Sequence, residues 1–249
     1  MAEQDVQTPR PSALHQAANG SLHRPIWRDP RVHRSVFGRR AHVAYALLAV
    51  FIVVLILEPF TGGLRGWGLS ADALDQGRWE VLGAHMVAHA GLWHLSGNAA
   101  VMFALTSPLM ARLGRGVLAW ARYLALFVGS GLAGAGLFLL MNPTGDIPAV
   151  GASGAISGLW AAHARLGQNG RFLPVLSRKV LINARDFALA NLVLFFALFL
   201  LVTLRGGEGG LAWEAHLGGY LFGLLAMPLI APQRPPADWE PHRPSSWLP

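Results

Sequence analysis

The sequence predicts an all-α membrane protein with six transmembrane helices. Hydrophobic residues make up 53% of the 249 positions and only 13% are charged, whereas soluble domains carry about 25% charged residues. The mean hydropathy is correspondingly positive, at +0.40. The apolar residues also gather in six runs, each close to the length that a helix needs to cross a hydrocarbon core of roughly 30 Å.

A long polar segment precedes the first apolar run. Residues 1–40 are rich in Arg, His and Pro and show no apolar periodicity, which predicts a basic, disordered cytoplasmic tail. No cleavable signal peptide is evident in it. The first span is expected over residues 41–57, and Pro59 with the glycines after it ends that helix.

A long connection then leads to the second span. Residues 58–93 are too polar to cross a membrane, but they contain Trp67, Trp79 and Trp93. Tryptophan is enriched where a membrane meets water. We therefore expect short helices that lie at the membrane surface.

Five further apolar runs complete the six-helix core, which is expected to occupy residues 41–231. The fourth run is full of small residues, and a glycine-rich turn follows the fifth. Residues 232–249 are rich in proline, which predicts a second disordered cytoplasmic tail. The five runs cover approximately residues 94–110, 119–141, 149–165, 187–204 and 213–230.

The distribution of positive charge agrees with this topology. If the N-terminus is cytoplasmic, only Arg65, Arg78 and Arg205 of the 20 Lys and Arg residues face outward. Cytoplasmic loops of membrane proteins carry such an excess of cations. We therefore expect both termini in the cytoplasm, and the net charge of +7 needs no nucleic-acid partner to explain it. The chain has no cysteine, which excludes disulfides, thiol nucleophiles and Cys-ligated metals.

Three groups of polar and small residues stand at the starts of spans two, four and six. Polar residues inside a membrane are costly and are candidates for function. These spans run in the same direction, so the groups share a depth below the outer surface and can meet in the folded bundle. The groups are His94–Asn98, Gly151–Gly154 and Ala215–Gly219.

Ser153 and His216 suit nucleophilic catalysis. A serine hydroxyl is a weak nucleophile until a base removes its proton, and a histidine with an ordinary pKa near 6.5 can serve as that base around neutral pH. Gly154 and Gly158 form a small-xxx-small pair, so Ser153 taken alone could equally mark a helix interface. The corresponding alternative for His216 is a structural hydrogen bond to a backbone carbonyl.

Small residues also prepare spans four and six for close packing. Ala215, Gly219 and Gly223 recur every four residues and therefore share one helix face. This face can press against the glycine-rich side of span four. His216 lies next to it, within reach of the Ser153 hydroxyl.

His94 and Asn98 are four residues apart, so they share one face of a helix. With the backbone N–H of Ser153 they could form an oxyanion hole for a tetrahedral intermediate; the alternative is a polar pair that joins two helices. His85 and His89 show the same spacing, which can chelate a metal. No Glu accompanies them in the HExxH arrangement and no Cys or obvious acidic ligand is nearby, so structural hydrogen bonds are favoured there.

No acidic residue is placed to complete a triad. Asp146 precedes span four, Asp186 falls on the inner side, and Glu214 adjoins His216 in sequence, where near neighbours on a helix do not face each other. The simplest prediction is a Ser–His dyad.

This combination resembles the rhomboid intramembrane serine proteases over about residues 41–231. The resemblance implies a six-helix rhomboid-like bundle with a water-filled cavity that opens outward. It also implies an acyl-enzyme mechanism with Ser153 as nucleophile and His216 as base, and it maps His94 and Asn98 onto oxyanion-stabilising positions. The motifs HxxxN, GxSG and a His with spaced small residues carry it, at His94, Asn98, Gly151, Ser153, Gly154, His216, Gly219 and Gly223.

The resemblance further implies partners and location. Substrates would be membrane proteins with a single transmembrane helix, cut near its outer edge at small residues, and no cofactor or metal is expected. We expect a multi-pass protein in the lipid bilayer of a bacterial inner (plasma) membrane. The alternatives are a catalytically silent rhomboid-like protein that binds membrane clients, or a metal-dependent hydrolase or small transporter built around His85, His89 and His94.

Two positions depart from the family pattern. Many rhomboids have a Trp-Arg pair in the first outer loop, where this chain has Arg78-Trp79-Glu80. Many also carry an aromatic residue four positions after the nucleophile, packed on the base, where this chain has Ser157. The orientation of His216 must therefore rely on another contact, such as a hydrogen bond.

Overall fold

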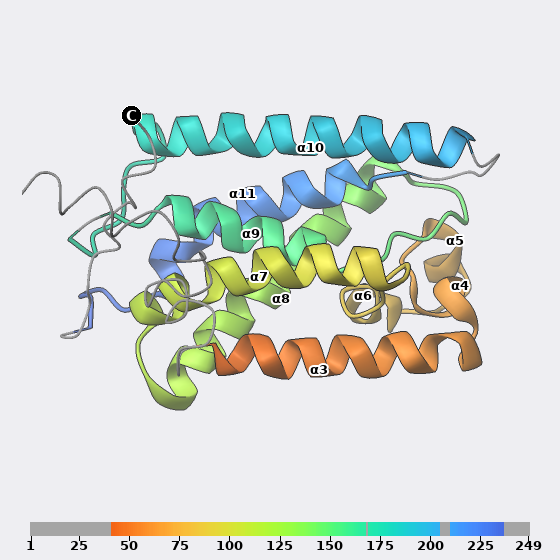
Figure 1. Ribbon diagram of the computed structural model, residues 1–249, viewed down its shortest axis with the longest axis horizontal. Coiled ribbons are helices and arrows are strands. Elements are labelled where there is room, and N and C mark those ends of the chain that lie inside the picture. The colour runs from red at the N-terminus through yellow and green to blue at the C-terminus, as the bar shows by residue number, and fades with distance from the viewer. Residues whose placement is uncertain (1–40, 168, 205–209, 237–249) are drawn as a thin grey trace, which may run out of the picture.

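The computed structural model describes residues 41–167, 169–204 and 210–236, and the chain is all-helical within them. These ranges contain helices and no β-strand, and the helices gather into one elongated bundle (Figure 1). The all-α class predicted from the sequence is therefore confirmed. The predicted N-terminal tail and most of the predicted C-terminal tail lie outside the described residues.

The longer helices of the described chain coincide with the six apolar runs. α3 (His42–Leu57) and α11 (Trp213–Ile230) begin and end within a residue of the predicted limits. α7 (Leu92–Leu113) and α8 (Gly116–Met141) each extend a few residues beyond them. The helices of the fourth and fifth runs differ more from their predicted limits.

The fourth helix, α9 (Ser153–Ala164), begins later than predicted. Ala149 is paired with Leu69 in an isolated β-bridge, and Gly151 has a φ of 115°. That φ lies in the left-handed region, which a right-handed helix does not contain. The chain therefore enters α9 only after this glycine.

The fifth helix, α10 (Arg178–Leu204), begins earlier than the predicted residue 187. The added stretch carries Arg178, Lys179, Arg185 and Asp186, so its hydropathy does not resemble that of a membrane span. It contains neither Gly nor Pro, however, and nothing in it interrupts a helix. The apolar run thus marks only the part of the helix that is suited to lipid.

The connection between α3 and α7, residues 58–91, folds into short helical segments, as the sequence predicted. Arg78 links a later part of this connection to one of the earlier segments, because its guanidinium donates to the backbone carbonyls of Arg65 and Gly66. The Arg65 side chain in turn lies 2.5 Å from a carboxylate oxygen of Asp146, in the turn before α9. The segments are η2 (Glu58–Phe60), α4 (Gly63–Trp67), α5 (Ala71–Asp75) and α6 (Val81–Ala84).

α9 lies inside the bundle, where α7, α8 and α11 pack against it (Figure 1). Most of its residues are buried, among them Ile156 and Leu159. A helix of 12 residues is about 18 Å long, well short of a hydrocarbon core of roughly 30 Å. If α9 is embedded in a membrane, at least one of its ends must therefore lie below the membrane surface.

Three helices of the described chain are long and apolar enough to cross a membrane. They comprise His42–Phe60, Gly116–Met141 and Arg178–Leu204. α7 and α11 are of comparable length, but they carry polar residues and glycines that lower their hydropathy. Helices that turn polar groups toward the interior of a membrane bundle have this composition.

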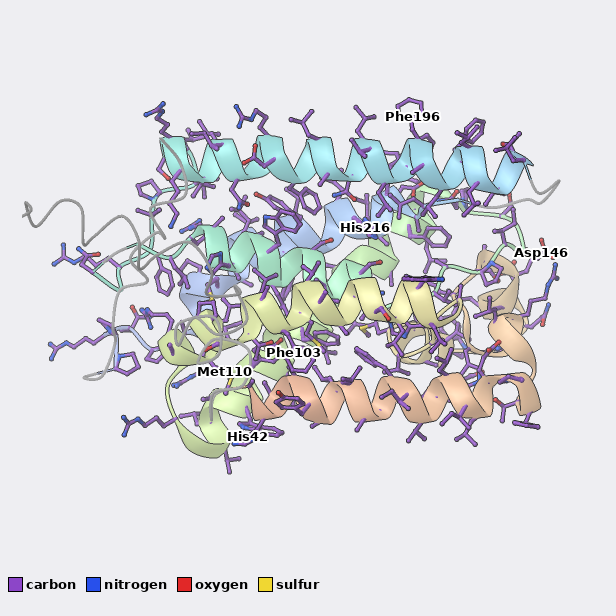
Figure 2. The ribbon with its side chains drawn as sticks, viewed as in Figure 1. His42, Phe103, Met110, Asp146, Phe196 and His216 are labelled. Atoms are coloured by element: carbon purple, nitrogen blue, oxygen red, sulfur yellow. The ribbon has the colours of Figure 1, made fainter. Side chains whose placement is uncertain are left out.

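α10 lies along one edge of the bundle and contacts it through its first half. The Phe187 ring stacks on Tyr220 of α11 with centroids 4.2 Å apart, and it meets Trp160 of α9 in an edge contact at 5.8 Å. No described residue of α10 after Asn191 is buried, and Figure 2 shows Phe196 pointing away from the bundle. The second half of this helix is therefore left for the surroundings to cover.

Candidate active site

Ser153 is the first residue of α9, and its hydroxyl meets His216. The Ser153 Oγ lies 2.7 Å from the Nε2 of His216, a normal hydrogen-bond distance for a hydroxyl that donates to a ring nitrogen. Ser153 is reached through Gly151, whose positive φ favours glycine. The structure thus brings together the candidate nucleophile and the candidate base, which are 63 positions apart in sequence.

Glycines determine how closely α9 and α11 approach. A Cβ built on Gly219 would overlap the carbonyl oxygen of Gly154, and one on Gly223 would overlap that of Gly158. The two backbones are therefore in direct contact, which small residues at these points permit. His216, in the first turn of α11 and only 5% exposed, is thereby held beside the start of α9.

The other ring nitrogen of His216 contacts a residue that the sequence analysis did not select. Its Nδ1 lies 2.5 Å from the Oδ1 of Asn191 on α10. An amide side chain inside the apolar run of span five was the available signal, since polar residues in such runs are functional candidates. Ser157, at the position of the family's aromatic residue, donates instead to the carbonyl oxygen of Ser153 at 2.8 Å.

His94 and Asn98 lie in the first two turns of α7, and each has a side-chain N–H that can donate a hydrogen bond. The Nδ1 of His94 accepts from the backbone N–H of Ala90 at 3.3 Å, so the ring proton resides on Nε2. The Nδ2 of Asn98 is buried and has no hydrogen-bond partner among the described residues. Because buried donors are nearly always satisfied, this amide has an unused capacity to bind an oxygen atom.

Both donors converge on Gly151. A Cβ built there would lie 2.7 Å from the Nε2 of His94 and 3.5 Å from the Nδ2 of Asn98. Glycine leaves that position open. The N–H of Ser153, in the first turn of α9, has no acceptor within its own helix. The three donors of the predicted oxyanion hole, on His94, Asn98 and the backbone of Ser153, thus lie at or near residues 151–153.

His85 and His89 make backbone hydrogen bonds in the chain between α6 and α7. Each Nδ1 bonds to a backbone carbonyl, at 2.9 Å and 3.2 Å respectively. Burial lowers the pKa of both rings, and His94 nearby helps to lower the pKa of His89 to about 4. Across the described ranges, no group of three or more His, Cys, Asp or Glu residues is arranged to hold a metal ion.

The acidic residues considered for a triad have partners elsewhere. Both ring nitrogens of His216 are taken by Ser153 and Asn191. The three acidic side chains form the pairs Glu214 with Asn142, Asp146 with Arg65 and Asp186 with Arg185. The third member of the hydrogen-bonded chain is therefore an amide.

Comparisons with known proteins agree with the motifs. A family model described as the Rhomboid domain matches residues 76–233, from the connection between α3 and α7 to just beyond α11. The chain is 25% identical over 191 residues to "Rhomboid protease GluP" of Bacillus subtilis (strain 168), covering 73% of this chain but only 33% of GluP. It is 30% identical over 179 residues to "Putative rhomboid protease YdcA" of the same strain, covering 70% of this chain and 77% of YdcA. The chain thus spans about one third of the length of GluP.

Proposed function

Because the chain belongs to the rhomboid family, we propose that it is an intramembrane serine endopeptidase that cuts other membrane proteins in or near their transmembrane helices. The chain is an integral membrane protein. One observation carries the proposal: the 2.7 Å contact between Ser153 Oγ and His216 Nε2 at the N-terminal end of a short, buried helix.

The first half of the proposed reaction forms an acyl-enzyme. His216 Nε2 takes the proton of Ser153 Oγ as that oxygen attacks the scissile carbonyl carbon. The carbonyl oxygen gains negative charge, which His94, Asn98 and the N–H of Ser153 stabilise. The intermediate collapses as His216 passes its proton to the leaving nitrogen. The amine product departs, and the other fragment remains on Ser153 as an ester.

Water completes the second half. His216 removes a proton from a water molecule as the water oxygen attacks the ester carbonyl. The second tetrahedral intermediate collapses when His216 returns this proton to Ser153 Oγ. The carboxylic acid product leaves, one peptide bond and one water have been consumed, and both side chains are restored.

The proposed location is a bacterial inner membrane, crossed six times, with both termini in the cytoplasm. α7 and α11 have 22 and 18 residues, about 33 and 27 Å, which suits a hydrocarbon core of roughly 30 Å. α7, α9 and α11 run in the same direction (Figure 1), so the starts of all three lie toward the same side. The cation distribution supports placing that side outward.

The proposed substrates are membrane proteins with a single transmembrane helix, cut at small residues near its outer edge. Inside a membrane, a helix keeps its carbonyl groups in internal hydrogen bonds. The scissile bond must therefore leave the helical conformation before Ser153 can attack it. Glycine, one of these small residues, is unfavourable in a helix, so a substrate that has glycine at the cleavage site unwinds there more readily.

Cleavage of a transmembrane substrate by purified protein in liposomes tests the proposal. Wild type is compared with Ser153→Ala, His216→Ala and the control Ser96→Ala, which changes an exposed serine on α7. We expect Ser153→Ala and His216→Ala to abolish cleavage and the control to cleave at the wild-type rate. Activity that survives in Ser153→Ala would show that another group is the nucleophile. A wild type that binds the substrate without cutting it would identify a catalytically silent binding protein.

A further inference from the structure

Asn191 is an amide side chain in the apolar part of α10, the part of the helix that is suited to lipid. The residues that follow it on α10 are apolar for more than two turns, and over residues 192–201 all of them are exposed except Phe195 and Leu198, which are half-buried. A polar group at such a position is costly unless it is paired. Asn191 is half-buried on the side that faces α11, so its partners indicate why an amide is present.

Both ends of the Asn191 amide are engaged. The Nδ2 donates to the backbone carbonyl oxygen of Phe187 at 2.9 Å, one turn earlier on α10. The Oδ1 lies 2.5 Å from the Nδ1 of His216. If the amide were rotated by half a turn, two oxygens would face each other at Phe187 and an N–H would face the imidazole. The carbonyl of Phe187 therefore determines which end of the amide His216 meets.

The consequence for His216 is a defined tautomer. An amide oxygen can only accept, so the imidazole proton must reside on Nδ1. Nε2 then carries the lone pair and accepts the Ser153 hydroxyl at 2.7 Å. With the opposite tautomer, Nε2 would carry the proton and could not remove one from Ser153. The hydrogen-bonded chain runs from α10 through α11 to α9.

We propose that Asn191 is a positioning residue, which holds His216 in the tautomer and orientation that allow Nε2 to accept the Ser153 proton. The inference rests on the proposed function of Ser153 and His216. Asn191 does not touch the substrate, and as a neutral amide it supplies direction rather than charge. Ser157, at the position where many rhomboids have an aromatic residue packed on the base, donates to the Ser153 carbonyl oxygen instead. Asn191 therefore supplies the contact that orients His216 in place of that aromatic residue.

The docking of α10 and the orientation of His216 depend on the same residue, Phe187. Its ring packs between Trp160 and Tyr220 and holds α10 against α9 and α11. Its carbonyl oxygen orients the amide of Asn191. The base is therefore correctly oriented only while α10 is docked.

A second asparagine on α10 provides a matched control. The Oδ1 of Asn183 accepts from the hydroxyl of Tyr220 at 3.0 Å, so it also forms a hydrogen bond between α10 and α11. It does not contact His216. Asn191→Leu and Asn183→Leu each remove one such bond and keep the size of the side chain, whereas Asn191→Asp keeps an acceptor oxygen beside His216.

Two readouts test the proposal in liposomes or micelles of the full chain. The first is kcat and KM for a transmembrane substrate. We expect Asn191→Leu to lower kcat by roughly 10–100-fold, part of the 10²–10⁴ that a general base contributes, with KM within about threefold of wild type because substrate binding is untouched. Asn191→Asp should recover most of kcat, and Asn183→Leu should stay near wild type.

The second readout is ¹⁵N NMR of histidine-labelled protein, with His216 assigned through His216→Ala. We expect the Nδ1–H tautomer in wild type and its loss in Asn191→Leu. An unchanged tautomer, a wild-type kcat in Asn191→Leu, or an equal loss in Asn183→Leu would overturn the proposal. If wild type does not cleave, or Ser153→Ala does, the proposed function fails instead. The tautomer then still decides whether Asn191 orients His216.

Discussion

Asn98 is a buried amide with a donor that no described residue uses. A buried polar group without a partner lowers stability by about 1–3 kcal/mol. Such a group is retained where it serves another purpose, and here the purpose proposed is to bind the oxyanion of a tetrahedral intermediate. Stability and activity should therefore respond in opposite directions when this donor is removed.

Asn98→Leu is expected to separate the two properties. The melting temperature should stay the same or rise, because no hydrogen bond from Nδ2 is lost. The value of kcat should fall by roughly 10²–10³-fold, the usual effect of removing one oxyanion donor. Thermal unfolding in detergent and cleavage of a transmembrane substrate measure the two effects.

Asn142→Leu is the control for this prediction. Asn142 donates to the carbonyl of Phe138 and to Glu214, so its loss should lower stability without a comparable loss of kcat. If Asn98→Leu instead lowered stability and activity in parallel, the amide would be a structural link between helices. That was the alternative left open by its spacing from His94.

At the scale of helices, the site depends on the direct contact between the backbones of α9 and α11. Gly219→Ala should break this contact, because its Cβ would overlap the Gly154 carbonyl oxygen and α11 would have to move. We expect a loss of about 1–3 kcal/mol in stability, as for other overpacked sites. The value of kcat should also fall, by more than the loss of folded protein alone would explain, since His216 moves with α11. Unfolding and cleavage assays measure both.

Gly136→Ala is the matched control, because a Cβ at this glycine of α8 would meet no atom within 4 Å. It should leave activity unchanged and raise stability slightly, since alanine favours a helix over glycine. Equal behaviour of the two variants would mean that the close approach of α9 and α11 is not needed to hold the site.

The helices themselves could be predicted well where composition changes sharply. Pro59 follows α3 closely, and the limits of α11 also match the apolar run. The early start of α10 was missed because its first residues are charged, so hydropathy reports lipid contact rather than helical conformation. The late start of α9 was missed because it depends on the φ of Gly151, which the residue type permits but does not dictate.

The sequence predicted that a contact such as a hydrogen bond orients His216, but it did not identify Asn191 as the residue that makes it. The absence of an aromatic at Ser157 called for another contact, such as a hydrogen bond. Asn191 lies in a run that is apolar on nearly every side, so the sequence does not specify which face of α10 turns inward. That rotation is set by the packing of Phe187 against α9 and α11, which is a tertiary property.

At the scale of the whole molecule, one buried arginine joins three distant segments. Arg112, near the end of α7, is 1% exposed. Its Nε donates to the carbonyl of Gly170 and its Nη2 to that of Pro232, beyond α11, while its guanidinium lies 4.4 Å from the centre of the Phe172 ring. Arg112, one of the cations expected on the cytoplasmic side, therefore also has a structural role, because its side chain is bound within the fold.

Arg112→Lys keeps the charge and should destabilise the fold. A lysine ammonium lacks the planar fork that reaches two carbonyls while stacking on a ring. We expect a lower melting temperature and an unchanged membrane orientation, measured by thermal unfolding and by reporters fused to the termini. Arg171→Lys, which alters an exposed arginine at the same end of the bundle, should change neither. A melting temperature unaffected by Arg112→Lys would contradict the role of the fork.

The uncovered half of α10 makes the surrounding amphiphile a structural partner of this protein. No described residue of α10 after Asn191 is buried, so acyl chains or detergent tails must cover most of that apolar surface and help to keep the helix docked. A micelle that wraps it loosely would release the amide from His216 while the tightly packed bundle of α7, α8, α9 and α11 stays intact. Loss of turnover on extraction would then report a misdirected imidazole in a folded molecule, and return to a bilayer would restore it without refolding.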